Sequence, residues 1–257
     1  MSMNIKPIPM LDDEVNEVRL ATAEIVNRDI VPNESDLYAS TRDGSRPSKE
    51  AIARAQELRK GVQDKVKKAK LWAPHLPPEF GGMGLSFMQH AYMNEILAYS
   101  PGAAPLFGVV APNSGNQKIL VKYGSPEQHE KWLIPLTEGR MQSGFSMTEP
   151  MNPGSDPRSL TTRAELDGDE WVINGHKWFT SNGHAADFYI VMCRTADPDD
   201  PGGANEKMTQ IIVPRETPGV NILRGVPVWG KASSHCEIKY ENVRVPKENQ
   251  LGQTGTG

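Results

Sequence analysis

The sequence predicts an α+β protein in which an all-α helical bundle domain, residues 1–140, precedes an antiparallel β-barrel or sandwich domain, residues 141–257. Two observations predict this division. Before residue 140, apolar residues recur with the 3.6-residue period of helices. After it, segments rich in Val, Ile, Thr and aromatic residues alternate with period two and are separated by turn residues. Helices followed by strands are typical of two sequential domains.

The helices expected in the first domain have recognisable ends. The run from Leu11 to Val31 starts with acidic side chains, which suit the positive end of a helix dipole, and Pro32 ends it. A second helix is expected to begin at the N-cap Ser48. Ser125 and Gln128 have the spacing of a capping box and predict the start of a later helix.

The second domain contains six segments that predict strands. Asn174-Gly175, between two of them, is a type I′ hairpin signal, and the segment 196–207 is expected to be an exposed loop. The predicted strands are Ser159–Leu166, Trp171–Ile173, Lys177–Thr180, Asp187–Arg194, Met208–Val213 and His235–Val245.

Composition excludes several classes of function. The net charge is −4 and neither half is basic, so a nucleic-acid role is not expected. No apolar segment approaches the length of a membrane span, and no signal peptide is visible. Six scattered histidines and two distant cysteines give no metal-site spacing, and Cys193 reads as a buried small hydrophobe. The expected location is the cytoplasm of a bacterium, or the mitochondrial or peroxisomal matrix of a eukaryote.

The segment FSMTEPMNPGSD, residues 145–156, could carry chemistry. A strand runs into Pro150, Pro153 and Gly154, so the chain must leave the sheet and expose its backbone. Thr148 can offer both its hydroxyl and its amide N–H to the carbonyl-rich edge of a flat heteroaromatic ligand. The alternative is an ordinary turn.

The segment NGHKWFTSNG, residues 174–183, is the second candidate. Period-two alternation would place Trp178 and Thr180 on one face, one against an aromatic ring and the other hydrogen-bonded to the ring edge. An ordinary hairpin strand with a core tryptophan explains the segment equally well. A third segment, residues 240–252, reads as the last strand of the domain and the exit towards another element.

These segments together resemble the acyl-CoA dehydrogenase family. The family patterns "TEP…GSD", "NGxKxWxTN", "VP…TPGV" and "F/YxxVxVPxxNxLG" followed by "GxG" match, in order, MTEPMNPGSD, NGHKWFTSN, VPRETPGV and YENVRVPKENQLGQTGTG. The segments PEFGGMGL and YGSPEQ, at residues 78–85 and 123–128, resemble the family's helical-domain signatures. The MNPGS segment is one residue longer than the family's usual spacing. The resemblance covers nearly the whole chain.

The resemblance implies an FAD-dependent oxidoreductase of fatty-acid and lipid metabolism. A base removes a proton from the acyl-CoA Cα while hydride passes from Cβ to flavin N5. Thr148 would lie at the flavin's pyrimidine edge, Trp178 on its ring system and Thr180 near N5, while Ser155 would contact the acyl-CoA substrate. The residues implied to line the flavin are Phe145, Met147, Thr148, Gly154, Trp178, Phe179 and Thr180. An electron-transfer flavoprotein or similar acceptor, and a homodimer or homotetramer, are the implied partners.

The catalytic base cannot be assigned to a residue of this sequence. In the family it is a carboxylate of a C-terminal helical domain, which also holds much of the FAD site, and that domain would begin beyond Gly257. We therefore expect a truncated form that is inactive alone. Three alternatives stay open: an acyl-CoA oxidase of the same fold, a flavin monooxygenase of the same fold, and a non-catalytic binding or assembly module.

Overall fold

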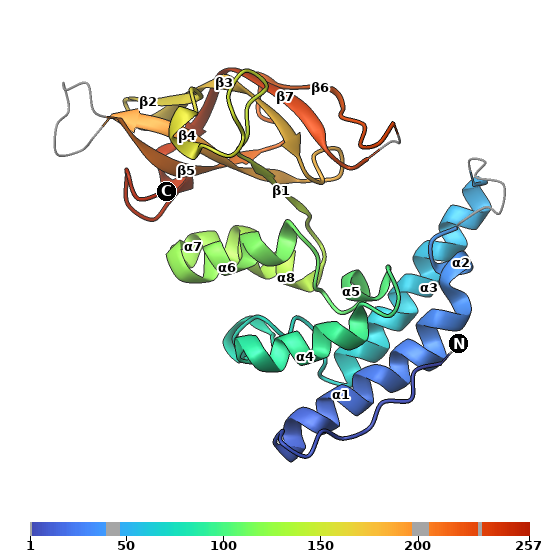
Figure 1. The fold of residues 1–257 in the computed structure, drawn as a ribbon. Helices are drawn as coiled ribbons and strands as arrows, with labels where there is room; N and C mark the ends of the chain where they lie inside the picture. The colour runs from blue at the N-terminus through green and yellow to red at the C-terminus, as the bar shows by residue number, and fades with distance from the viewer. Residues whose placement is uncertain (1, 40–46, 197–205, 231–232) are drawn as a thin grey trace. The chain divides into compact units, whose positions relative to one another are not determined.

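The chain folds as two compact units, Met1–Val110 and Ala111–Gly257. The structure is a computed structural model that describes residues 2–39, 47–196, 206–230 and 233–257 (Figure 1). The change from helix to strand falls between Glu138 and Ser143. Three helices before that change nevertheless belong to the second unit, so the two-domain boundary at 140/141 stays a prediction.

The first unit is helical throughout its regular structure. Its helices are α1 (Asp13–Ile25), α2 (Glu34–Leu37), α3 (Lys49–Lys68), α4 (Phe87–Leu97) and α5 (Ala103–Leu106). A π turn (Val26–Ile30) and a 3-10 turn (Val31–Asn33) connect α1 to α2. The prediction that Pro32 ends the helix is wrong: the regular α-helix ends at Ile25, and the chain stays helical through Pro32 as far as Leu37. Proline is tolerated here because it occupies the first turn of the 3-10 segment, where an N–H has no helical partner.

The predicted cap at Ser48 is confirmed, and the first unit has a second cap that was not predicted. Ser48 Oγ accepts a hydrogen bond from Ala51 N at 3.1 Å and begins α3. Ser86 and Gln89 form a capping box at the start of α4. Both satisfy amide groups that the first helical turn leaves without partners. The apolar faces of α1, α3 and α4 then bury a common core that includes Ile25, Val66 and Met93.

The second unit begins with three helices that pack on its sheet (Figure 1). They are α6 (Asn113–Tyr123), α7 (Pro126–Gln128) and α8 (Ile134–Glu138), with a π turn (His129–Leu133) between the last two. The predicted capping box of Ser125 and Gln128 is confirmed. The amide of Gln128 also donates to the carbonyls of Glu248 and Gln250, at 2.7 and 2.8 Å, and so ties α7 to the sheet's last strand.

The sheet has eight strands in the order β6-β7-β3-β2-β4-β5-β8, with β1 paired to β4. Their bounds are β1 (Ser143–Ser146), β2 (Arg163–Asp167), β3 (Glu170–Thr180), β4 (Phe188–Ala196), β5 (Glu206–Pro214), β6 (Val220–Gly225), β7 (Cys236–Pro246) and β8 (Gln250–Leu251). The prediction of helices followed by a β domain is confirmed. The sheet is mixed rather than wholly antiparallel, because β1 and β2 both pair with β4 in parallel, and it is not closed into a barrel.

The predicted hairpin turn at Asn174-Gly175 is wrong. Both residues lie inside β3, and the turn falls earlier, where Asp167 pairs with Glu170 around a left-handed Gly168. At Asn174 the ladder with β7 has a bulge, and Asn174 Oδ1 accepts a hydrogen bond from Asn242 N at 2.8 Å. The glycine serves close packing instead of a turn: a Cβ on residue 175 would lie 2.2 Å from Thr162 Oγ1. The predicted loop at 196–207 lies largely outside the described residues.

This packing gives a test of the strand. Gly175→Ala should lower the free energy of unfolding by about 1–3 kcal/mol, because the added methyl overlaps the Thr162 side chain. Gly61→Ala is the matched control: it lies inside α3 with nothing within 4 Å, so it should stabilise by about 0.5–1 kcal/mol. Denaturant unfolding monitored by circular dichroism measures both. Equal stability of the two variants would contradict the position of Gly175 in β3.

Candidate functional site

The two candidate segments meet at one place in the second unit. Trp178 N donates to Thr148 O at 3.0 Å, and Thr148 Oγ1 donates to Trp178 O at 2.8 Å. A single bridge also pairs Phe145 with Ser181. The turn after β1 and the end of β3 are thus joined through main chain and side chain. The structure brings together the predicted site residues Phe145, Met147, Thr148, Trp178, Phe179 and Thr180.

A buried ion pair anchors this junction. Lys177 Nζ lies 3.0 Å from Glu149 Oε1, and the side chains are 0% and 3% exposed. The same ammonium donates to Met147 O at 2.6 Å, so it fixes the main chain just before Thr148. Lys177 comes from β3 and Glu149 from the turn after β1, so the pair connects the two segments directly.

Both carboxylate oxygens of Glu149 accept hydrogen bonds. Thr161 donates to Oε2 through its amide and its hydroxyl, at 2.8 and 2.7 Å, and Asn152 Nδ2 donates at 2.6 Å. Thr162 N donates to Oε1 at 2.8 Å. Burial alone would raise the pKa of Glu149, but the Thr161 hydroxyl, Lys177 and Thr162 outweigh it and lower the pKa from 4.5 to about 2. For the Lys177 ammonium, burial lowers the pKa, because it disfavours the charged form, and the nearby Glu149 offsets part of that effect.

The end of β3 departs from regular strand geometry. Lys177 pairs with Ile238 and Thr180 with Cys236, so two residues of β3 oppose the single residue Glu237 of β7. The second of these, Phe179, has φ +53°, in the left-handed region that bulky residues rarely occupy. Phe179 is 41% exposed, and its ring meets the Trp178 ring edge-on with the ring centroids 4.9 Å apart. Strain of this kind clusters at functional sites.

The bulge overturns the expectation that Trp178 and Thr180 share a face. It puts Thr180 on the buried side of the sheet with Lys177, and Thr180 is 0% exposed. The Thr180 hydroxyl lies 3.0 Å from Ser146 Oγ, which also accepts from the Tyr240 hydroxyl at 3.0 Å. The period-two argument fails because it assumes an unbroken ladder. Thr180 therefore packs inside the domain.

The neighbouring residue is the one with an accessible hydroxyl. Ser181 is partly exposed, and its Oγ lies 2.9 Å from His235 Nδ1. Counted along the pattern NGxKxWxTN from Asn174, the tryptophan and threonine of the family fall on Phe179 and Ser181. Sequence reasoning missed this count. It also gave no role to His235, Ser146 or Tyr240, although Ser146 and Tyr240 lie inside two of the quoted segments.

The rest of the turn is more exposed. Gly154 lies against Thr148, since a Cβ there would be 3.5 Å from Thr148 Cγ2, whereas Ser155 faces solvent. Pro153 O accepts from Asp156 N at 3.1 Å and closes the turn. The structure thus places Gly154 beside the junction and leaves Ser155 at its outer edge.

The residues at the junction fit a flat aromatic ligand. Phe179 offers an exposed ring, and among the described residues Thr148 N–H donates to no protein group. An apolar ring surface beside an unpaired amide donor suits a heteroaromatic ring with carbonyl groups at its edge. In the described part of the chain, no group of three or more His, Cys, Asp or Glu side chains could hold a metal ion.

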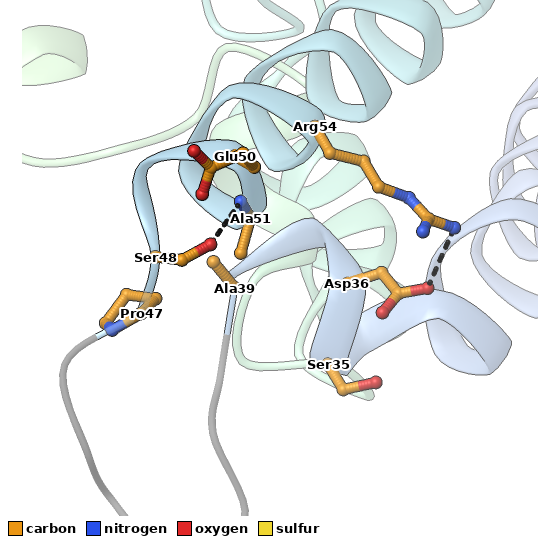
Figure 2. Close-up of a pocket in the computed structure, with 8 residues that line it drawn as sticks. All are labelled: Ser35, Asp36, Ala39, Pro47, Ser48, Glu50, Ala51 and Arg54. Carbon is orange, nitrogen blue, oxygen red and sulfur yellow. Dashed lines mark hydrogen bonds and ion pairs between the residues drawn. The ribbon is translucent and has the colours of Figure 1, made fainter.

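A separate hollow of the first unit has different chemistry. Residues of α2 and α3 line it, and Ser48 and the ion pair between Arg54 and Asp36, 3.8 Å apart, are its polar features (Figure 2). Among the described residues that line it, there is no aromatic ring and no buried titratable group. Over the residues that the structure describes, no helix is long and apolar enough to cross a membrane.

Two family models match the chain. Residues 12–140 match the N-terminal domain of acyl-CoA dehydrogenases, and residues 144–243 match the middle domain. The probable acyl-CoA dehydrogenase FadE2 of Mycobacterium tuberculosis is 41% identical over 203 residues, which cover 76% of this chain and 48% of the relative. Mouse acyl-CoA dehydrogenase family member 10 is 32% identical over 256 residues, which cover 96% of this chain and 23% of the relative.

Solved structures agree with these matches. A Mycobacterium abscessus structure assigned as an acyl-CoA dehydrogenase has a TM-score of 0.83 and 32% identity, and the match covers 96% of this chain and 62% of that one. A glutaryl-CoA dehydrogenase of Mycobacterium smegmatis, solved in complex with FADH2, shares the fold with a TM-score of 0.71 and 24% identity over 96% of this chain and 57% of that one. The chain spans about half the length of the first of the curated relatives and less of the second.

The ion pair predicts a pH-dependent loss of stability. Because the pKa of Glu149 is lowered on folding, its contribution is present above pH 4.5 and is lost as the pH falls towards 2. Glu149→Gln should therefore cost at least about 3 kcal/mol of unfolding free energy at pH 7, and the difference from wild type should shrink below pH 4.5. Denaturant titrations between pH 3 and 7 measure this difference.

The exposed pair of Asp167 and Arg244 supplies the control. Asp167 is 65% exposed, so Asp167→Asn should change stability by less than about 1 kcal/mol at any pH. A cost of Glu149→Gln that stays constant down to pH 3 would mean that the lowered pKa of Glu149 is wrong.

Proposed function

Because the chain belongs to the acyl-CoA dehydrogenase family, we propose that residues 111–257 form one wall of an FAD site in an enzyme that oxidises an acyl-CoA thioester between Cα and Cβ. When bound, FAD supplies the acceptor for the hydride that leaves Cβ. The observation that carries this proposal is the junction itself: Phe179, an exposed aromatic residue with a strained φ, follows Trp178, which is hydrogen-bonded to Thr148, and among the described residues the Thr148 amide donates to no protein group.

Each residue of the wall has a chemical task in this proposal. Thr148 N–H donates to the carbonyl edge of the flavin, and the hydrogen bonds with Trp178 hold that amide in place. Phe179 packs on the ring system and excludes water from it. Ser181 presents its hydroxyl at the N5 edge, the role that the sequence had assigned to Thr180. The remaining wall residues are Phe145, Met147, Gly154 and Trp178.

The buried residues hold this wall in position. Glu149 and Lys177 fix the main chain on either side of Thr148. Thr180, through Ser146, fixes the strand end that carries Ser181. Preorganised donors act more strongly than mobile ones, because they need no reorganisation when charge develops on the ligand.

Glu149 is unsuited to be the base that takes the Cα proton. A base must be free to accept a proton, and its pKa should lie near the working pH. The carboxylate of Glu149 accepts hydrogen bonds at both oxygens, and its pKa is lowered to about 2. Another group must therefore accept that proton.

The substrate and partners follow from the family and belong to the same proposal. Ser155, exposed at the outer edge of the turn, is placed to contact the pantetheine or pyrophosphate part of an acyl-CoA. The electrons then pass to an electron-transfer flavoprotein or a similar acceptor, and the intact assembly is a homodimer or homotetramer.

Flavin binding tests the wall. Phe179→Ala should raise the dissociation constant for FAD by about tenfold, because a lost aromatic contact costs about 1.4 kcal/mol. Phe87→Ala is the matched control: that ring is 84% exposed on α4 of the first unit and should leave the constant unchanged. Titration of FAD followed by its fluorescence and absorbance measures both constants.

Four outcomes are informative. No FAD binding by the wild-type protein, or an equal effect of both substitutions, would overturn the flavin wall. Because residues 1–257 alone hold no assigned base, the reaction is tested in a flavin-loaded protein that also carries the family's C-terminal helical domain, where anaerobic addition of acyl-CoA should remove the absorbance of oxidised flavin. Rapid return of that absorbance with oxygen would indicate an acyl-CoA oxidase instead of a dehydrogenase.

A further inference from the structure

The hydroxyl of Ser181 has one side-chain partner among the described residues, His235. Ser181 follows β3 directly, and His235 precedes the first residue of β7. The two atoms, Ser181 Oγ and His235 Nδ1, are 2.9 Å apart, and the His235 ring meets Phe179 edge-on at 5.7 Å. His235 therefore contacts two of the residues that the proposed function places against the flavin.

A serine at this position needs such a partner. Threonine, which the family pattern carries here, is β-branched, so its side chain is restricted in χ1 by its own methyl group. Serine lacks that methyl, and its hydroxyl can rotate more freely. The hydrogen bond to His235 restricts the serine hydroxyl from outside the residue.

The main chain holds His235 firmly in place. His235 N donates to Ser233 Oγ at 3.2 Å, and His235 O accepts from Val226 N at 2.8 Å. Ser233 Oγ in turn donates to Val226 O at 2.6 Å. These bonds use only the backbone of His235, so its side chain can be replaced without breaking them.

We propose that His235 is a positioning residue that fixes the hydroxyl of Ser181 towards the N5 edge of the flavin. This rests on the proposed flavin wall. With Nδ1 as acceptor, the hydroxyl proton of Ser181 points to the imidazole, and the lone pairs of Oγ face the ligand. Reduced flavin carries a proton at N5 and can donate it to Ser181 Oγ in a hydrogen bond, whereas oxidised flavin has no such proton. A Ser181 hydroxyl that only accepts hydrogen bonds therefore favours binding of the reduced flavin.

The test separates positioning from mere packing. In the flavin-loaded protein, His235→Ala should change the ratio of affinities for reduced and oxidised FAD by about threefold to tenfold in favour of the oxidised form. A tenfold change corresponds to about 30 mV in the midpoint potential of a two-electron couple, which dye equilibration measures without any turnover. His235→Asn, whose amide can occupy the position of Nδ1, should retain most of the wild-type potential.

Two double variants identify Ser181 as the target. With Ser181→Ala already present, His235→Ala should have no further effect on the potential. With Ser181→Thr present, His235→Ala should shift the potential less than it does alone, because the threonine methyl restores the restriction. An equal shift in all three backgrounds would overturn the proposal and point to packing against Phe179.

Other variants replace His235→Ala if it fails to fold. If His235→Ala does not fold, His235→Asn and His235→Gln replace it, since only asparagine reaches the position of Nδ1; equal potentials for the two would overturn the proposal. A wild-type protein that binds no FAD defeats the proposed function as well. Normal FAD binding with an unchanged potential in His235→Ala defeats only the role of His235.

Discussion

The buried ion pair between Glu149 and Lys177 is the constraint on which the rest of the candidate site depends. Removing two charges from water costs several kcal/mol for each ion, and the cost is repaid only when every remaining donor and acceptor is satisfied. Thr161, Thr162 and Asn152 supply that satisfaction to Glu149, and Met147 O supplies it to Lys177. The pair therefore contributes geometry more than net stability, because it permits only one relative placement of the turn after β1 and the end of β3.

That placement lets the chain keep a strained conformation where the ligand would lie. Phe179 and Asn182 both have positive φ, and they lie on either side of Thr180 and Ser181. An isolated strand end would relax from such a conformation, since each such residue costs about 1 kcal/mol or more. Here the hydrogen bond between Thr180 and Ser146, and the one that Tyr240 donates to Ser146, hold the strand end from the inside. The exposed ring of Phe179 is thus supported by polar contacts buried beneath it.

The sequence was sufficient where a signal depends only on near neighbours. The caps at Ser48 and Ser125 were predictable because the partners lie within three residues along the chain. The meeting of Thr148 with Trp178 was implied only by the family resemblance. The continuity of β3 through Asn174-Gly175 could not be foreseen, since it depends on Thr162 packing against the glycine from another part of the chain. The pairing of Glu149 with Lys177 depends on how the turn after β1 packs against β3, and period-two patterns do not determine such packing.

The bulge also shows how one extra residue changes chemistry. Opposite Glu237, β3 places both Trp178 and Phe179, so every later side chain is displaced by one position from the regular alternation. The period-two pattern predicted that the Thr180 hydroxyl faces the ligand. In the structure that hydroxyl forms a hydrogen bond in the core, and Ser181 takes the outward position. The family pattern has threonine at this position, and this chain has Ser181. Serine is not β-branched, so its χ1 lacks the restriction that a β-branched side chain places on itself. The Ser181 hydroxyl is then held by a residue from another part of the sheet. That residue is His235, which directly precedes β7.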